Sequence, residues 1–459
     1  MDQNQIDQIK ELIDYERNRT SPPEGFPKLP DLPGKRYTDP EFYELEKENL
    51  WKKSWLYAGH LDEIPNVGSY KLWERAGQPV ILVRKNKEKV NAFYNMCRHR
   101  GAAIVREEYG EAEKLVCGYH GFTYDYEGKL IGKRDPKDFV DFDDSCRNLH
   151  KVNVELFGNL IFVNFDLEAV SLKENLGVIY EELEEFQFGS LRLVDQYSYN
   201  LKCNWKIAME ANMEVYHVKS IHPETVHTGL DYTGNVNTFY PNGHGRMIAP
   251  NRSSPEPTAS ALKANPDVLK NELNDSDKNS DLPYYYKTKI SELNDDRPEI
   301  ETVGYIARTC TQSYNLVPNF VSPMAEKGFP ILLWWPKSVN ECIFDVIWVA
   351  PDWGEGKIPK KYKDIWDAHI EGFNGVLDED LQFGGWIQKA VDSYVFDGVP
   401  LSYQEARIYH WHQQVDKIIG LNKIPQELCV APKINEDWMH PNDNVRRLQE
   451  HQNMTTAAE

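Results

Sequence analysis

The spacing of hydrophobic and polar residues changes several times along this chain of 459 residues. The first 36 residues are polar and then rich in proline, and they predict a short helix over 5–16 followed by an extended arm. At Thr38-Asp39-Pro40-Glu41 a capping side chain, a proline and an acid predict the start of a second helix. This helix would carry Phe42, Leu45 and Trp51 on its inner side.

From about residue 55 to 166 the pattern changes to short apolar runs, separated by turn residues such as Asn66-Val67-Gly68 and Glu127-Gly128. Runs of roughly five residues rich in β-branched and aromatic side chains predict strands. The expected strands cover 69–73, 79–84, 89–94, 114–117 and 159–165. The region therefore predicts a small β-rich domain.

After residue 166 the pattern becomes longer and mixed. Helices are expected over 172–186, 204–219 and 402–419, a further helix is expected across 364–376 leading into 379–391, and strands are expected over 331–335 and 342–350. Between them, residues 250–300 are rich in Asn, Asp, Lys, Pro and Ser, which is typical of a long surface excursion. The chain thus divides into an N-terminal arm and helix (1–54), a β-rich domain (55–166) and a larger domain (167–459).

Composition narrows the possible functions. Acidic residues exceed basic ones by 72 − 52 = 20, which argues against nucleic acid or an anionic membrane as the main partner. Residues 1–5 lack the apolar stretch of a secretory signal, and the apolar run 329–336 is too short to span a bilayer, so we expect a cytoplasmic protein. The seven scattered cysteines disfavour a disulfide framework and leave metal binding as an option.

Cysteine and histidine pair in two short segments, Cys97-x-His99 and, after seventeen intervening residues, Cys117-x-x-His120. Thiolates together with imidazoles suit either a zinc ion or an iron–sulfur centre. A glycine that permits a tight turn follows each histidine, in segments expected to be hairpin loops. This setting favours a Rieske [2Fe–2S] cluster, in which two cysteines hold one iron and two histidines hold the other, with structural zinc as the alternative.

A second group of possible ligands lies in the predicted helix over 204–219. Glu210, Glu214 and His217 stand at i, i+4 and i+7, so a continuous helix would present them on one face. His222 would meet the same metal only if the helix distorted or ended, and Pro223 fits an ending. Two histidines and a carboxylate form the facial triad of O₂-activating non-haem iron. The alternative is an ordinary amphipathic helix with two polar-face histidines.

Two stretches resemble the Rieske non-haem iron oxygenases, specifically the large (α) subunits of the ring-hydroxylating oxygenases. They read Asn-Met-Cys-Arg-His-Arg-Gly at 95–101 and Cys-Gly-Tyr-His-Gly-Phe-Thr-Tyr at 117–124. The places of the two extra, disulfide-forming cysteines of respiratory Rieske proteins hold Ala102 and Tyr119 here, so the similarity is to the low-potential oxygenase type. The resemblance extends over roughly 38–420 and is weakest over 250–300.

The resemblance implies a role for individual residues. The family's His-x₄-His pattern falls on His217 and His222, and its late aspartate ligand falls on Asp380, with Asp378 as the main competitor. Glu214 stands where most relatives have the aspartate that carries electrons from the cluster of one subunit to the iron of the next. Glutamate at this position is similar to the branch of quaternary-ammonium monooxygenases.

The fold implied is α+β, a Rieske β-sandwich-like domain plus a helix-grip catalytic domain, with the N-terminal arm packed on the catalytic domain. The activity implied is that of a terminal oxygenase with a [2Fe–2S] cluster and mononuclear Fe(II). Electrons would come from NAD(P)H through a reductase and possibly a ferredoxin, and O₂ would hydroxylate an organic substrate. An aromatic hydrocarbon is the first expectation, and a quaternary-ammonium or other non-aromatic compound is the alternative. A homotrimer is expected, possibly with a small β subunit. A pure electron carrier, the rival class, would need only the first motif.

Overall fold

The computed structural model describes residues 1, 3–223, 225–251 and 296–434, so most of the excursion expected over 250–300 lies outside the described residues. Contacts between residues divide the chain into two compact units. One unit, called the β-rich unit below, comprises Lys47–Asn175 and Phe188–Leu193. The other, called the mixed unit, comprises Met1–Glu46, Leu176–Gln187 and the chain from Val194 onward.

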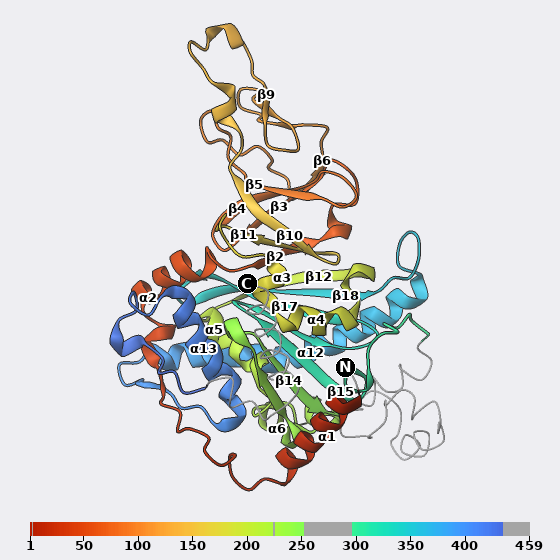
Figure 1. The fold of residues 1–459 in the computed structure, drawn as a ribbon, viewed down its shortest axis with the longest axis vertical. Coiled ribbons are helices and arrows are strands. Elements are labelled where there is room, and N and C mark those ends of the chain that lie inside the picture. The colour runs from red at the N-terminus through yellow and green to blue at the C-terminus, as the bar shows by residue number, and fades with distance from the viewer. Residues whose placement is uncertain (2, 224, 252–295, 435–459) are drawn as a thin grey trace, which may run out of the picture. The chain divides into compact units, whose positions relative to one another are not determined.

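The β-rich unit contains a seven-stranded sheet in the order β2-β11-β10-β5-β4-β3-β6 and a three-stranded sheet in the order β7-β8-β9 (Figure 1). Ala76 and Gly77 both have positive φ (51° and 71°) and join β3 to β4 as a two-residue hairpin turn. The strands expected from the sequence are all present. Their bounds are β2 Leu56–His60, β3 Ser69–Arg75, β4 Gln78–Arg84, β5 Val90–Tyr94, β6 Tyr109–Glu111, β7 Leu115–Val116, β8 Thr123–Tyr124, β9 Leu130–Gly132, β10 Lys151–Phe157 and β11 Leu160–Asn164.

The mixed unit is built on a second seven-stranded sheet, ordered β12-β18-β17-β16-β15-β14-β13. The strands from β13 to β18 pair antiparallel in that order, and stacked Trp334 and Phe344 are both fully buried in β17 and β18. The strand bounds are β12 Leu191–Leu201, β13 Val236–Phe239, β14 Gly245–Pro250, β15 Cys310–Leu316, β16 Phe320–Met324, β17 Phe329–Ser338 and β18 Glu341–Pro351, and a separate pair joins β1 Leu32–Pro33 to β19 Gly398–Val399.

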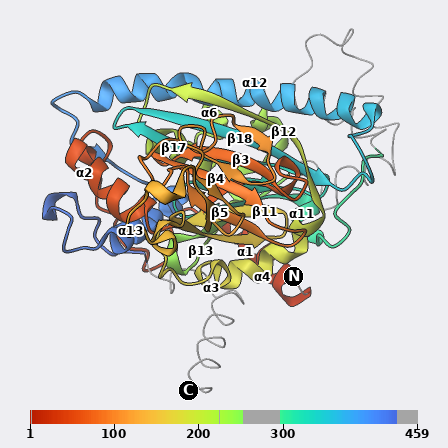
Figure 2. The same cartoon turned by 90° about the horizontal axis from the view of Figure 1, so that it is seen from above.

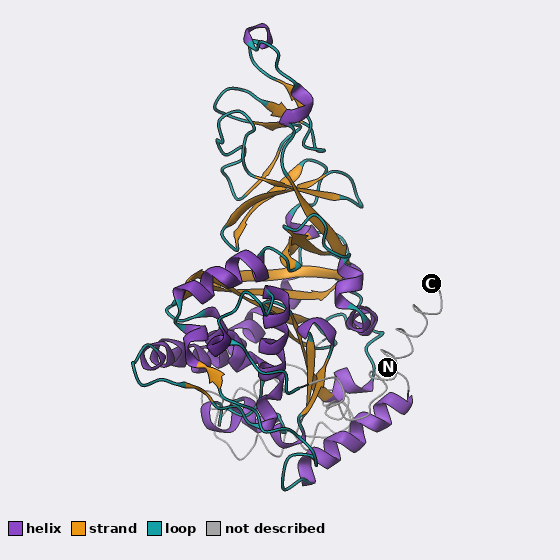
Figure 3. Cartoon of the chain, turned by 60° about the vertical axis from the view of Figure 1, so that its left-hand side comes forward, coloured by secondary structure: helices purple, strands orange, loops and turns teal. Residues whose placement is uncertain are grey.

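The longer helices belong to the mixed unit (Figure 3). The predicted start of the second helix is confirmed, because Asp39 accepts from the N–H of Glu41 (2.7 Å) with Pro40 at the first helical position. The main helices are α1 Gln3–Asn18, α2 Pro40–Leu45, α4 Val178–Leu183, α5 Trp205–Glu210, α6 Val218–Ile221, α7 Val226–Gly229, α11 Tyr305–Thr309, α12 Lys360–Val391 and α13 Ala406–Ile419.

Two helix predictions differ from the structure. The helix expected over 172–186 is broken at Gly177 (φ 56°), between α3 Leu172–Leu176 and α4, whereas the helix expected across 364–391 is confirmed as the unbroken α12 (Figure 2). The single helix expected over 204–219 is instead interrupted between α5 and α6. Within the described part of the chain, no helix has both the length and the apolar character needed to cross a membrane.

Candidate metal centres

Two loops of the β-rich unit that carry Cys97 and Cys117 have the same backbone design. In each loop the cysteine carbonyl accepts from the N–H of the glycine four residues on, Gly101 (3.0 Å) or Gly121 (2.9 Å). The cysteine N–H donates to the carbonyl of the residue after that glycine, at 2.9 and 2.8 Å. Both glycines have positive φ, 76° and 74°, a conformation that L-residues with a side chain rarely adopt. The loops therefore close on themselves through local hydrogen bonds.

The four predicted cluster ligands come together as a histidine pair and a cysteine pair. Nδ1 of His99 lies 3.1 Å from Nδ1 of His120. Two ligand atoms that are each about 2.1 Å from one metal, at right angles, are about 3 Å apart, so this spacing fits two nitrogens on one iron. Cys97 and Cys117 are buried, free and in electrostatic contact with each other. The donor set thus fits a cluster with two nitrogens at one end and two thiolates at the other.

Tyr124, the last residue of the second motif, supports the cluster loops. Its hydroxyl accepts from the N–H of Arg98 (3.0 Å) and lies 3.4 Å from Sγ of Cys97. Burial raises the pKa of Tyr124, which keeps the phenol protonated as a donor, and burial also raises the pKa of Cys97. A thiolate at this buried position therefore needs a compensating positive charge, which bound iron supplies. This role of Tyr124 was not predicted from the sequence, although the residue lies inside the motif at 117–124.

In the mixed unit the chain around the second histidine pair is not a continuous helix. After α5 a short 3₁₀ turn, Ala211–Met213, ends at Glu214, whose backbone is extended (φ −144°, ψ 173°). The Glu214 carboxylate accepts from the N–H groups of Tyr216 and His217, which is how a side chain competes with helical hydrogen bonding. The prediction that Glu210, Glu214 and His217 share one helical face is therefore wrong.

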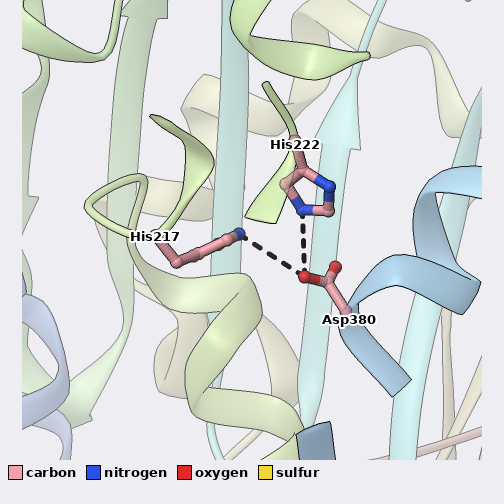
Figure 4. Close-up of side chains that lie close together, drawn as sticks. All are labelled: His217, His222 and Asp380. Atoms are coloured by element: carbon pink, nitrogen blue, oxygen red, sulfur yellow. Dashed lines mark ion pairs between the residues drawn. The ribbon is translucent and has the colours of Figure 1, made fainter. Parts of the chain in front are cut away.

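Three possible metal ligands meet beside α6, which His217 and His222 flank (Figure 4). Oδ1 of Asp380, from α12, lies 2.9 Å from Nε2 of His222 and 3.6 Å from Nε2 of His217. Ligands about 2.1 Å from one ion at angles of 90–120° are about 3.0–3.6 Å apart, so the spacing fits a shared metal. The exposed Asp378 is not part of this group among the described residues.

The unsatisfied state of Asp380 supports the same interpretation. Its Oδ1 is buried and accepts no hydrogen bond of good geometry from the described residues. Such an atom is costly to bury unless a cation or a donor meets it. The two Nε2 atoms around it are the donor type that non-haem iron prefers, and three ligands leave positions open on the metal.

Each of these histidines is oriented by a carboxylate on its other nitrogen. Nδ1 of His217 lies 2.5 Å from Oε1 of Glu214, and Nδ1 of His222 lies 2.6 Å from Oε2 of Glu379. Glu379 also accepts from the Thr225 hydroxyl at 2.7 Å. Burial opposes protonation of both rings, yet the carboxylates around them raise the pKa of each histidine. A proton on Nδ1 leaves Nε2 free to bind a metal.

Glu379 is a functional candidate that was not predicted from the sequence. Its only sequence signal is its place next to Asp380, since the contact with His222 joins residues 157 positions apart. Glu210, by contrast, is not in the metal group. It accepts from the Tyr37 hydroxyl (3.0 Å) and lies 2.8 Å from Nε2 of His412, and burial raises its pKa to about 8.

Comparisons with known families cover both units. Residues 54–143 match the model of the Rieske [2Fe–2S] domain, and residues 188–421 match that of the ring-hydroxylating α subunit catalytic domain. The first match favours the iron–sulfur cluster over the zinc alternative. The second match excludes a simple electron carrier, because a catalytic domain is also present.

Curated relatives include both monooxygenases and dioxygenases. The glycine betaine monooxygenase oxygenase subunit of Chromohalobacter salexigens is 31% identical over 202 residues, which are 44% of this chain and 45% of the relative. The 2-aminobenzenesulfonate 2,3-dioxygenase subunit alpha of an Alcaligenes species is 35% identical over 224 residues, 47% of this chain and 56% of the relative. The chain thus spans about half the length of the curated relatives it matches.

Solved structures share the fold. A quaternary ammonium Rieske monooxygenase, CntA, superposes with a TM-score of 0.64 at 19% identity, covering 86% of this chain and 98% of that one. Naphthalene 1,2-dioxygenase from Rhodococcus sp. gives a TM-score of 0.65 at 18% identity, covering 90% of this chain and 97% of that one. The predicted α+β fold class is confirmed.

Proposed function

We propose that this chain works as the terminal oxygenase component of a multicomponent enzyme, because it belongs to the family of Rieske ring-hydroxylating oxygenase α subunits. The cofactors of that family are a Rieske [2Fe–2S] cluster and a mononuclear iron. The observation that carries the proposal is the buried, unsatisfied Oδ1 of Asp380 facing Nε2 of both His217 and His222. When bound, the cluster supplies single electrons and the iron activates O₂.

The proposed ligands are Cys97, His99, Cys117 and His120 for the cluster, and His217, His222 and Asp380 for the iron. The chain's own contribution is to hold these atoms in place. Each of the two closed cysteine loops would supply one thiolate and one imidazole to the cluster. Glu214 and Glu379 fix the rings of His217 and His222 so that each Nε2 faces the metal.

We also propose that Glu214 links the iron to the cluster of a neighbouring subunit. Its buried carboxylate contacts the iron-ligand ring of His217 through Oε1. The ring of His120 would use Nδ1 for the cluster, as its approach to His99 suggests, which leaves Nε2 to donate to such a carboxylate across an interface. Inter-subunit electron transfer is described for the quaternary ammonium Rieske monooxygenase whose fold this chain shares.

The bridge is tested with Glu214→Gln, which keeps the shape of the side chain and removes its charge. We expect both metal centres to stay loaded, while electron transfer from the reduced cluster to the iron slows by about 100-fold or more. Stopped-flow absorbance of the cluster measures the rate. A wild-type rate in this variant, or full activity in a monomeric protein, would rule out the bridge.

The first experiment on the proposed function is an assay of iron and acid-labile sulfide in the purified protein. We expect a brown protein with two sulfides and three irons per chain, which corresponds to one two-iron cluster and one mononuclear iron. A colourless protein that holds zinc would contradict the proposal.

Substrate and partners require a second experiment. Hydroxylation of an aromatic compound is the first proposal, and oxidation of a quaternary-ammonium compound is the alternative that glutamate at position 214 and the glycine betaine and carnitine monooxygenase relatives favour. A matched reductase, with and without a ferredoxin, should be assayed with a panel of both classes and the products identified. Native mass spectrometry tests the proposed trimer and a small β subunit, and cell fractionation tests the proposed cytoplasmic location.

A further inference from the structure

The sharp turn that ends at Glu214 is held by an arginine from a distant part of the chain. Arg407, the second residue of α13, is almost completely buried. Its Nε donates to the carbonyl of Met213 (2.7 Å) and its Nη2 to the carbonyl of Asn212 (3.2 Å). These carbonyls come just before the point where helical hydrogen bonding stops, so the guanidinium satisfies acceptors that the interrupted helix leaves open.

The same guanidinium also contacts the sheet. Nη1 of Arg407 donates to the carbonyl of Ser313 in β15 at 3.0 Å. Three carbonyls from two separate segments are therefore held by one planar group, and this ties the turn to the sheet. A planar fork with fixed donor directions can do this, whereas the single ammonium of a lysine cannot reach three such acceptors in the same geometry.

The fold leaves space for this arginine. Gly245 in β14 lies against the aliphatic stem of Arg407, and a Cβ at Gly245 would lie 3.2 Å from both Cγ and Cδ of the arginine. A methyl group there would press on the stem and on Asn315, whose Oδ1 would lie 2.5 Å away. The path of Arg407 to the turn therefore depends on the absence of a side chain at position 245.

Electrostatics agree with this geometry. Burial lowers the pKa of Arg407 to about 9, and the charge of Glu214 opposes that effect. Glu214 is thus the carboxylate whose field reaches the guanidinium, although the direct hydrogen bonds of Arg407 go to carbonyl oxygens.

We propose that Arg407 is a positioning residue, which fixes the turn at Asn212–Met213 so that the Glu214 carboxylate meets the ring of His217. The inference rests on the proposed function, since it assigns Arg407 to the support of the iron site. Among the described residues, the hydrogen bonds of the Arg407 side chain go to backbone carbonyls and not to the proposed metal ligands. Arg407 acts through the backbone of Asn212 and Met213, which sets the position of Glu214.

The test uses Arg407→Lys, which keeps the charge and loses the fork. We expect both metal centres to be retained in folded protein, with electron transfer from the reduced cluster to the iron slowed by about 10- to 100-fold. The reduced protein is mixed with oxygenated buffer, and the cluster absorbance is followed. Electron paramagnetic resonance of the ferrous site treated with nitric oxide should show a changed ligand geometry, a readout that general destabilisation does not move.

Two further variants keep the test decisive. Gly245→Ala should reproduce the Arg407→Lys effects in a weaker form, and it serves alone if Arg407→Lys does not fold. Arg246→Lys is the matched control, because Arg246 is equally buried but pairs with Glu182 (2.9 Å) rather than with the turn. Wild-type transfer in Arg407→Lys, or an equal loss in Arg246→Lys, would overturn the inference. A wild-type protein without iron would instead reject the proposed function.

Discussion

The two candidate centres both use a pair of histidines, yet they are supported in opposite ways. The cluster loops are local, since each cysteine bonds to the backbone of residues four and five positions further along. The iron site is assembled from distant segments, with His222 and its partner Glu379 separated by 157 positions. A loop that closes through its own backbone can be recognised from sequence, whereas a site assembled by long-range contacts depends on the whole fold.

The largest effect is expected when one histidine ligand is removed from either centre, because each substitution should empty one centre and leave the other loaded. His217→Ala should lose the mononuclear iron and reduce turnover to background, because only two protein ligands would remain, while the visible spectrum of the cluster is unchanged. His99→Ala should do the reverse, with loss of the cluster colour and retention of the mononuclear iron. Metal analysis and absorbance spectra check both outcomes. Iron retained after His217→Ala would contradict the ligand assignment.

A smaller effect is expected when the ligand stays and its supporting carboxylate is removed. Glu379→Ala frees Nδ1 of His222, so we expect the dissociation constant for iron to rise by about 10- to 100-fold. Competition with a chelator measures the affinity. Asp378→Asn is the control, because this neighbour is exposed and outside the ligand group, and its iron affinity should match the wild type.

The buried charges beside α5 lead to a prediction on pH. Burial raises the pKa of Glu210 to about 8, against the lowering effects of the Tyr37 hydroxyl and of the positive charges of Lys206 and Arg36, while Glu46 adds to the rise. In the unfolded chain a glutamate titrates near pH 4.3. The folded protein therefore keeps a proton that the unfolded chain has lost, and this contribution to stability decreases as the pH rises toward about 8.

The pH effect should be measured above pH 6.5. Below that value His412, whose pKa burial lowers well below its usual range, contributes a slope of opposite sign. Between pH 6.5 and 8 Glu210 should lower the free energy of unfolding by at most about 1.4 kcal/mol per pH unit, and Glu210→Gln should remove that slope. Urea unfolding at several pH values measures it. An unchanged slope in the variant would show that Glu210 is ionised throughout.

The smallest effect concerns the local design of the cluster loops. A Cβ at Gly101 or Gly121 would meet nothing within 4 Å, so Gly→Ala at either position adds only the strain of a positive φ, about 1–2 kcal/mol. The two variants should be equally destabilised in thermal unfolding, because the loops share one geometry. Gly375→Ala in α12 is the control, since that helical glycine also faces open space and should gain up to about 1 kcal/mol.

The features that could be predicted from the sequence are the local ones, and the features that could not are those that depend on contacts between distant segments. Five of the ten strands of the β-rich unit (β3, β4, β5, β7 and β11) and the turn glycines at 101 and 121 were predicted, because their patterns are short and local. The break at Glu214 was not, because it depends on a side chain that caps the next turn and on Arg407 from α13. Asp380 was reached only through the family resemblance, and Glu379 was not assigned at all.

Because α12 is unbroken, the position of the Asp380 carboxylate depends on the orientation of the whole helix. At 1.5 Å per residue the 32 residues of this helix span about 48 Å, and Asp380 lies about 30 Å from its first residue. A tilt of roughly 2° about that end would therefore shift Asp380 by about 1 Å, a displacement that can cost a catalyst about 100-fold. Two hydrogen bonds hold α12 on either side of Asp380. Asn374 accepts from the Tyr197 hydroxyl (2.6 Å), and Gln388 accepts from the N–H of Asn204 (2.6 Å). Substitutions at Asn374 or Gln388 would therefore change the position of Asp380 in the metal site by small amounts.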